Sequence, residues 1–353
     1  MKYTVIWQSE RHASRKWIEE EFGPYISNHI YDGRRELVLD DAILVDDYVY
    51  ARPIDYYARF SGKRAFMVHF GDEFYEIASD VYKHFRGVFH AYWADVFDES
   101  YIMKLPLGYT SEALSNDSSP PIPASRRKYV WSFLGEVNKS SRPDMARELS
   151  RVEPHFFYPT DRLSGWTLYN SSSTGSRRFT RQECAEVLRN STFAPAPMGN
   201  ANIESYRLYE ALEESAIPIV EKRLTLDYYR ELLGDHPIPT VRSWAEARKL
   251  VGDLVKSPAR LDELQLECRD WWGKFKRSYS HAVGAFLEER SLDSAPRGQL
   301  VTDWGQTRIW RGIELLRHHD RRAGFRRIVR QVSRLAKTGR MRVAWTQKNP
   351  VSK

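Results

Sequence analysis

The chain has 353 residues, of which 42% are hydrophobic and 29% are charged. This composition excludes wholesale disorder, and the length indicates two domains of ordinary size or one large one. No run approaches the ~20 apolar residues that would span a bilayer. The N-terminal sequence MKYTVIWQSERH lacks the apolar core of a signal peptide, so we expect a cytoplasmic protein. The two cysteines, Cys184 and Cys268, cannot build a disulfide scaffold or a four-ligand zinc site.

The net charge of +7 is unevenly distributed along the chain. Eleven lysines and arginines but only one acidic residue follow residue 318, so the segment 319–353 carries +10 and the remaining 318 residues carry −3. The basic character therefore belongs to a tail and not to the body. A mildly acidic body argues against a nucleic-acid groove through the fold, and we do not expect nucleic acid as a partner.

The first 110 residues alternate between strand-like and helix-like patterns. Apolar, β-rich runs predict strands at 2–8, 42–50, 65–70 and 87–92. Helical patterns between them predict helices at 12–22, 54–60 and 74–85. Strands separated by helices of about ten residues favour βαβ units and a parallel sheet.

A second series of the same kind follows a serine- and proline-rich stretch at 115–125. The predicted strands are 129–134, 155–158, 191–196 and 216–221. The predicted helices are 142–152, 205–214, 226–233 and 244–256. Two further helices are predicted, one opened by a capping box of Thr180 and Glu183 and one from Pro258 to about residue 275. We expect an N-terminal domain at 1–118, a linker at 119–125, a second domain at 126–290, a helical segment at 291–318 and the basic tail at 319–353.

The chemistry is most legible in the loop and helix before the last strand of the second series. The loop contains Gly199 and Asn200, and the helix begins at Ser205. Backbone amides at such a turn, together with the helix dipole, favour an anion. Arg207 and Glu210 share one helical face, where a guanidinium suits a diphosphate and a carboxylate suits the two hydroxyls of a ribose. The alternative is an ordinary surface ion pair beside a plain turn glycine.

Several runs of sequence resemble one family of enzymes. SYRLYEALE from Ser205, followed by AIPIV from Ala216, looks like the signature of exostosin-like glycosyltransferases. FAPAPMG from Phe193 resembles that family's strand and glycine loop. Further similarity to exostosin-like and ribitol-xylosyltransferase-like proteins lies in FRGVFHAYW from Phe85, KLPLGY from Lys104, and FLG ending at Gly135. The resemblance covers roughly residues 63–275 and implies a bacterial-type member with the GT-B fold, in which two Rossmann-like domains face a cleft.

The same resemblance implies a function for individual residues. Arg207 would contact the diphosphate of a nucleotide-sugar donor, with UDP as the expected nucleotide, and Glu210 would contact the ribose. The remaining expected donor-binding residues are Gly135, Lys139, Arg142, Gly199, Asn200 and Ser205. For Lys139 and Arg142 the alternative is a surface charge. Because cations and amides can stabilise the departing diphosphate, we expect no metal and no other cofactor.

An inverting transfer of this kind needs a base for the acceptor hydroxyl. Asp72 and Glu73 follow a predicted strand, at the edge where a parallel sheet binds its ligands, and are the candidates. The alternative is that Asp72 caps the next helix and that Glu73 complements its dipole. His69 fits a core histidine better than a base. The pair Asp46 and Asp47 lies in a strand-like run, where neighbours point to opposite faces, and we interpret it as structural.

The tail contains a basic amphipathic pattern at 321–337, in which apolar residues recur at helical spacing and arginines fill the other face. Such a helix suits an anionic membrane surface, and an enzyme with a lipid-linked acceptor would work there. Packing on the body and binding of nucleic acid are the alternatives. The sequence thus predicts a glycosyltransferase that extends a cell-surface glycan, cytoplasmic and peripheral at the inner face of the membrane. A nucleotide-activated polyol phosphate as donor, or a non-catalytic binding protein, are the competing hypotheses.

Overall fold

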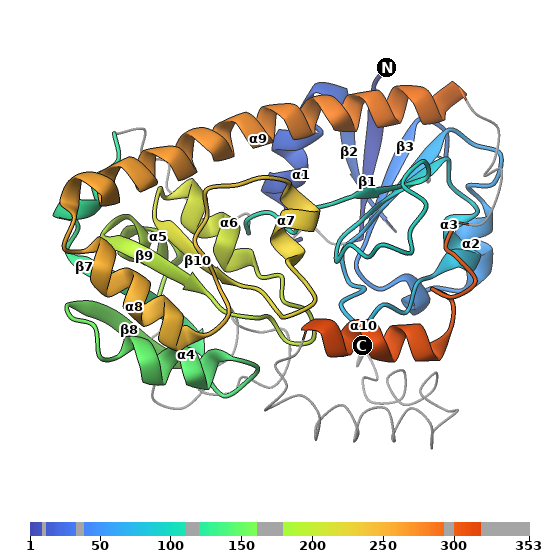
Figure 1. The fold of residues 1–353 in the computed structure, drawn as a ribbon. Helices are drawn as coiled ribbons and strands as arrows, with labels where there is room; N and C mark the ends of the chain where they lie inside the picture. Colours follow the sequence, from blue (N-terminus) through green and yellow to red (C-terminus); the bar gives the residue numbers. More distant parts are fainter. Residues whose placement is uncertain (9–11, 33–38, 111–119, 161–178, 293–299, 319–353) are drawn as a thin grey trace, which may run out of the picture.

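The fold is described from a computed structural model, which covers residues 1–8, 12–32, 39–110, 120–160, 179–292 and 300–318. Two parallel sheets lie side by side, and one long helix runs along both of them (Figure 1). The predicted tail at 319–353 and the part of the stretch 115–125 before residue 120 lie outside the described residues.

The first sheet has the strand order β2-β1-β3-β4-β5-β6, and all its neighbours are parallel. The strands are β1 (Tyr3–Trp7), β2 (Ile26–Tyr31), β3 (Ala42–Asp46), β4 (Ala65–His69), β5 (Gly87–His90) and β6 (Ile102–Lys104), and the helices between them are α1 (Arg15–Glu21), α2 (Ile54–Ala58) and α3 (Ser79–Tyr82). Every residue of β3 and β4 is buried, as expected where a parallel sheet is covered on both faces. We call this part the first unit.

The second sheet has the order β11-β10-β9-β7-β8 and is also parallel throughout. Its strands are β7 (Tyr129–Glu136), β8 (His155–Thr160), β9 (Ser191–Ala196), β10 (Ile217–Glu221) and β11 (Thr240–Val241), with the helices α4 (Arg142–Leu149), α5 (Arg181–Arg189), α6 (Tyr206–Glu213), α7 (Tyr228–Leu233) and α8 (Trp244–Leu254). We call this part the second unit. The two parallel sheets confirm the predicted fold class, two Rossmann-like α/β units in the GT-B manner.

Helix α9 (Pro258–Leu292) joins the two units. Its Trp272 stacks on Trp17 of α1 at 5.8 Å between ring centroids, and Tyr279 donates a hydrogen bond to the carbonyl of Lys104. The predicted helix ended near residue 275, but buried positions continue at the helical spacing through Val283 and Leu287. The expected second domain at 126–290 therefore includes a helical stretch that packs on the first unit.

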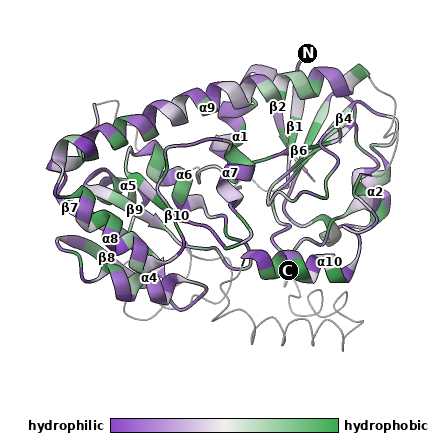
Figure 2. Ribbon diagram, in the orientation of Figure 1, coloured by the Kyte–Doolittle hydropathy of each residue, from purple (hydrophilic) through white to green (hydrophobic). Residues whose placement is uncertain are grey.

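Helix α10 (Arg308–His318) contacts both units on the side of the molecule opposite α9 (Figure 1). Its His318 lies 2.9 Å from the hydroxyl of Tyr75 and accepts a hydrogen bond from the amide of Ile203. Hydrophobic and hydrophilic residues alternate along α9 and α10, as expected for helices with one buried side (Figure 2). Ile309 and Ile313 nevertheless remain exposed on α10.

One predicted element of the first unit was wrong, and one strand was missed. The helix expected at 74–85 is reduced to α3, because Tyr75 and Ile77 have positive φ and the carboxylate of Asp72 takes the amides of Glu76 and Ile77. Strand β2 was missed, because an edge strand with polar and partly exposed residues carries no continuous apolar run.

Candidate functional site

The loop between β9 and α6 forms a nest of backbone amides. The amides of Asn200, Ala201 and Asn202 all donate to Oε1 of Glu73, at 2.9, 2.6 and 3.2 Å. Three consecutive amides around one oxygen make a site for an anion. A side chain at Gly199 would meet the carbonyl oxygen of Glu204 at 2.7 Å, so only glycine fits the loop there.

The loop is held in this shape from several sides. Its Met198 amide donates to Glu221, a buried carboxylate at the end of β10. Ser140 donates to the carbonyl of Gly199 at 2.6 Å, and the amide group of Asn202 donates to the hydroxyl of Tyr75 at 2.7 Å. Contacts from both units therefore set the loop before any ligand binds.

Arg207 lies in the first turn of α6 and points toward the end of β7. Its guanidinium carbon is 4.3 Å from the ring centroid of Phe133 and its Nη2 contacts Gly135. Gly135 has a φ of +139°, and a Cβ there would collide with this guanidinium. The absence of a side chain at Gly135 therefore leaves room for the guanidinium of Arg207. The sequence alone did not indicate this relationship. Ser205 is the N-cap residue of α6, but its side chain makes no capping hydrogen bond.

Arg142 and Lys139 stand beside the same loop with different partners. Arg142 is buried and donates to the carbonyls of Met198 and Glu136, at 3.3 and 3.0 Å. Burial, and after it the charge of Arg207, lowers the pKa of Arg142 to about 9. Lys139 pairs with Glu136 at 3.5 Å. Arg142 is therefore not the surface charge of the alternative, and its Nε and Nη1 are used on backbone carbonyls, while its contact with a donor phosphate stays a prediction.

Glu210 lies one turn after Arg207 and faces the first unit. Its Oε1 accepts a hydrogen bond from Thr110, which is buried, at 2.7 Å. The carboxylate thus occupies the contact between the units and is not part of an exposed ion pair with Arg207. Oε1 of Glu210 therefore already accepts a hydroxyl in this structure, and its predicted contact with a ribose stays a prediction.

The two candidate bases have different surroundings. Asp72 is 4% exposed, and its two oxygens accept the amides of Glu76 and Ile77. Burial alone would raise the pKa of Asp72, but the neighbouring imidazole of His90 outweighs it and lowers this pKa. Asp72 therefore holds the 72–77 turn but does not cap the next helix, because α3 begins at Ser79 with Ala78 as its N-cap residue, whereas Glu73 is half-buried and reaches the amide nest.

Two further residues confirm a structural reading. His69 is buried, with its Nδ1 at 2.6 Å from the hydroxyl of Tyr82, and burial lowers its pKa to about 4. Asp46 is buried and accepts hydrogen bonds from the amide of Tyr48 and the hydroxyl of Tyr57. Neither side chain lies in contact with the amide nest.

The sequence reasoning missed a pair formed by His12 and Asp47. His12 Nε2 lies 2.9 Å from Asp47 Oδ1, and its Nδ1 accepts the amide of Ser14. The hydroxyl of Ser14 in turn lies 3.3 Å from that of Tyr206, the first residue of α6. His12 follows β1 and Asp47 follows β3, two strands of the first sheet. Because the ends of parallel strands meet at one edge of a sheet, these positions could have predicted the pair.

The sequence model for the RXYLT1 C-terminal domain matches residues 113–291, just over half of the chain. The chain belongs to this family. The match confirms the predicted exostosin-like, ribitol-xylosyltransferase-like class and, with it, glycosyltransferase activity. The amide nest, Arg207 and Glu210 all lie within the matched residues.

Solved structures with a similar course of the chain are glycosyltransferases of low sequence identity. One is a DNA-modifying β-glucosyltransferase, solved with and without uridine diphosphoglucose. It has a TM-score of 0.49 and 11% identity, over 83% of this chain and 100% of that one. Another is the BGT of T4 phage in complex with UDP and Mn²⁺, with a TM-score of 0.42 and 11% identity over 82% and 100%. A search of curated proteins finds no match.

Proposed function

We propose that the chain transfers a sugar from a nucleoside-diphosphate sugar, with UDP as the expected nucleotide, to an acceptor hydroxyl. The observation that carries the proposal is the β9–α6 loop, where three consecutive amides converge on one carboxylate oxygen. Amides arranged in this way bind an anionic oxygen of any origin. In the donor complex, a phosphate oxygen takes the position that Oε1 of Glu73 has here.

The residues around the nest supply the charge that a diphosphate requires. Arg207 lies in the first turn of the following helix, and Lys139 and Arg142 both interact electrostatically with Glu73. As the bond between the sugar and the diphosphate breaks, negative charge grows on the leaving group, and fixed amides and cations stabilise it. We therefore propose a metal-independent transfer, with Glu210 binding the ribose in place of its contact with Thr110.

Glu73 then has two roles, one after the other. The donor phosphate displaces its carboxylate from the amides, which frees it beside the reacting atoms. The acceptor oxygen attacks the anomeric carbon, the bond from this carbon to the diphosphate oxygen breaks, and the hydroxyl proton moves to Glu73. A single displacement of this kind inverts the anomeric centre.

We propose further that the acceptor is a cell-surface glycan, free or lipid-linked, and that the tail docks at the inner face of an anionic membrane. The sequence at 321–337 is basic and amphipathic, and α10, which precedes it, exposes Ile309, Ile313 and Leu316 at one helical spacing. Among the described residues, no helix combines the length and apolarity needed to cross a bilayer.

Nucleotide release from UDP-, GDP-, CMP- and CDP-linked donors tests the function. Arg207→Ala and Glu210→Ala should each weaken donor binding by about 1–3 kcal/mol, the cost of stranding a charged hydrogen-bond partner. Arg147→Ala and Glu263→Ala are matched controls, since these side chains are 59% and 62% exposed. If Arg207→Ala and Glu210→Ala bind every nucleotide as the parent does, the donor site is elsewhere.

The same panel separates the competing hypotheses. Release of nucleotide only from CDP-linked polyol donors would favour a polyol-phosphate transferase. The donors have to decide this, because the diphosphate site of such an enzyme has the same chemistry. Binding without turnover across all donors and acceptors would favour a non-catalytic protein.

A further inference from the structure

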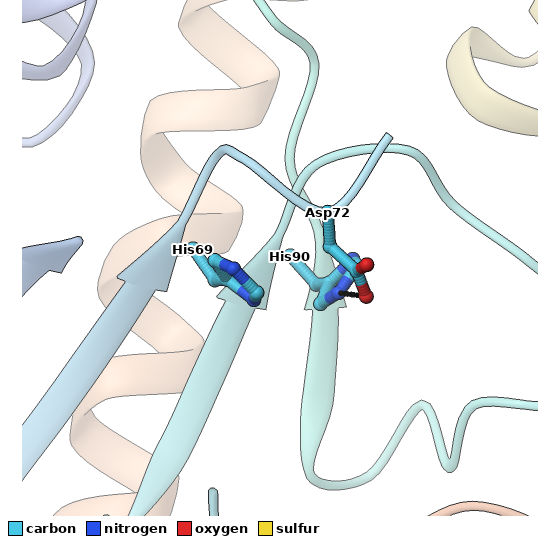
Figure 3. Close-up of side chains that lie close together, drawn as sticks. All are labelled: His69, Asp72 and His90. Atoms are coloured by element: carbon cyan, nitrogen blue, oxygen red, sulfur yellow. Dashed lines mark ion pairs between the residues drawn. The ribbon is translucent and has the colours of Figure 1, made fainter. Parts of the chain in front are cut away.

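Three side chains with metal-binding chemistry meet at the carboxyl edge of the first sheet. His69 ends β4 and His90 ends β5, and these two residues are register partners on adjacent parallel strands. Asp72 follows in the turn after β4, and its carboxylate reaches the imidazole of His90 (Figure 3). The topology of the sheet, and not sequence spacing, brings the three together.

The distances suit one small cation. One ligand atom from each residue lies within 4.8 Å of the other two. His90 Nε2 and Asp72 Oδ2 are 3.3 Å apart, which matches the ~3.3 Å between neighbouring ligands of a tetrahedral zinc ion with bonds of about 2.0–2.1 Å.

The surroundings orient the ligands as they do around bound metals. His69 Nδ1 is engaged by the hydroxyl of Tyr82 at 2.6 Å, which leaves Nε2 for coordination. Both oxygens of Asp72 accept backbone amides, those of Glu76 and Ile77. The positions of a histidine nitrogen and a carboxylate are therefore set by other groups before a cation arrives.

An independent observation points to a missing partner. His90 is fully buried, at 0% exposure, yet neither of its ring nitrogens makes a hydrogen bond. Buried polar atoms in folded proteins nearly always have a partner. Nε2 of His90 lies 3.3 Å from Asp72 Oδ2 as an ion pair without hydrogen-bond geometry, and Nδ1 has neither a hydrogen bond nor an ion pair.

We propose that His69, Asp72 and His90 bind a divalent cation of the zinc type through two imidazole nitrogens and one carboxylate oxygen. Two imidazoles and a carboxylate are a donor set that zinc accepts. The three residues are buried, so the cation serves to fasten the 70–77 turn to the sheet. Glu73 is the neighbour of Asp72 in this turn, and the cation acts on it only as a positioning element. The proposal is independent of the donor chemistry, and its test uses no nucleotide.

The test is the metal content of the full-length protein, measured by mass spectrometry after dialysis without chelator. We expect about one zinc per chain, and binding of Co²⁺ to chelator-treated protein with the visible absorption of a tetrahedral site. Chelation should lower the melting temperature, and added Zn²⁺ should restore it. His69→Gln and His90→Gln should each lose the metal, whereas the exposed His281→Gln on α9 should retain it.

Contrary outcomes are equally clear. A parent protein without metal, whose melting temperature and Co²⁺ spectrum do not respond to added ions, would overturn the proposal and leave a buried Asp72–His90 ion pair. Full metal content in both glutamine variants would place the ion elsewhere. If the variants do not fold, the Co²⁺ titration of the parent decides, because the intensity of its visible absorption reports whether the ion is bound in a tetrahedral site.

Discussion

Oε1 of Glu73 lies 2.9 Å from the backbone nitrogen of Asn200, although the two residues are 127 positions apart. A side chain of the first unit thus fills an anion site of the second. The contact joins the units and occupies the position proposed for the donor phosphate. Donor binding and release of Glu73 are therefore coupled events.

Glu73→Ala should affect binding and turnover in opposite directions. The affinity for UDP should rise, because the competing carboxylate is gone, while turnover should fall by about 10²- to 10⁴-fold, because the base is lost. Calorimetric titration with UDP and nucleotide-release assays measure the two effects. Glu76→Ala, an exposed change in the same turn, is the control. Unchanged UDP affinity in Glu73→Ala would show that the amides do not bind the donor.

Gly135→Ala should displace Arg207. The new Cβ collides with the guanidinium, and a φ of +139° is unfavourable for alanine. We expect a loss of stability of about 1–3 kcal/mol together with weaker UDP binding. Gly252→Ala is the matched control, since nothing lies within 4 Å of its added Cβ and the site is inside α8. That change should stabilise the protein by about 1 kcal/mol. Equal UDP affinity in both variants would contradict the proposed role of Arg207.

The contact between the units should weaken in Tyr228→Phe. The hydroxyl of Tyr228 donates to buried Glu204 at 2.6 Å and accepts the amide of Trp93 at 3.0 Å. Its removal leaves both groups with one partner fewer, at a cost of about 1–3 kcal/mol. Urea denaturation at neutral pH measures the loss. A difference of less than about 0.5 kcal/mol would mean that water replaces the hydroxyl.

Stability should decline with rising pH because of Glu21. Burial raises the pKa of this carboxyl to about 8, from an ordinary value of 4.5 in the unfolded chain. The folded state therefore keeps a proton that the unfolded state releases, so this contribution is complete below pH 4.5 and is lost as the pH rises to about 8. Relative to Glu21→Gln, the free energy of unfolding of the parent should fall by on the order of 3 kcal/mol between pH 5 and pH 8. Parallel pH profiles for parent and variant would refute the expectation.

Membrane docking should require both the tail and α10. Full-length protein should sediment with vesicles that contain anionic lipid, less so at high salt, and a 1–318 truncation should not. The double variant Ile309→Asn with Ile313→Asn, at exposed positions of α10, should bind more weakly than the parent. Equal binding of the full-length and truncated forms would remove the proposal.

The elements that follow from local chemistry were predicted well. The strand at 191–196 has the predicted bounds, and the capping box between Thr180 and Glu183 forms as expected. Both depend on residues close in sequence, whose backbone preferences and capping bonds do not need the rest of the fold. The loop with Gly199 belongs to the same class, since a strand, a tight turn and a helix start are local features.

The contacts that individual side chains make could not be predicted from the sequence. The sequence could offer Asp72 and Glu73 as equal candidates, but it could not show that one caps its own turn while the other crosses to the second unit. It could offer Arg142 as a phosphate ligand, but not reveal that two of its nitrogens are used on the carbonyls of Met198 and Glu136.

The amino-acid pattern by itself determined the two α/β series and the loop that can hold an anion, because hydrophobic period, glycine and capping residues act over a few positions. The family was indicated by the resemblance of short runs of sequence. Only the tertiary structure decided what occupies that loop, which cations surround it, and that His69 and His90 stand side by side. These outcomes depend on strand order and on the packing of two units, and such contacts between distant residues leave no periodic trace along the chain.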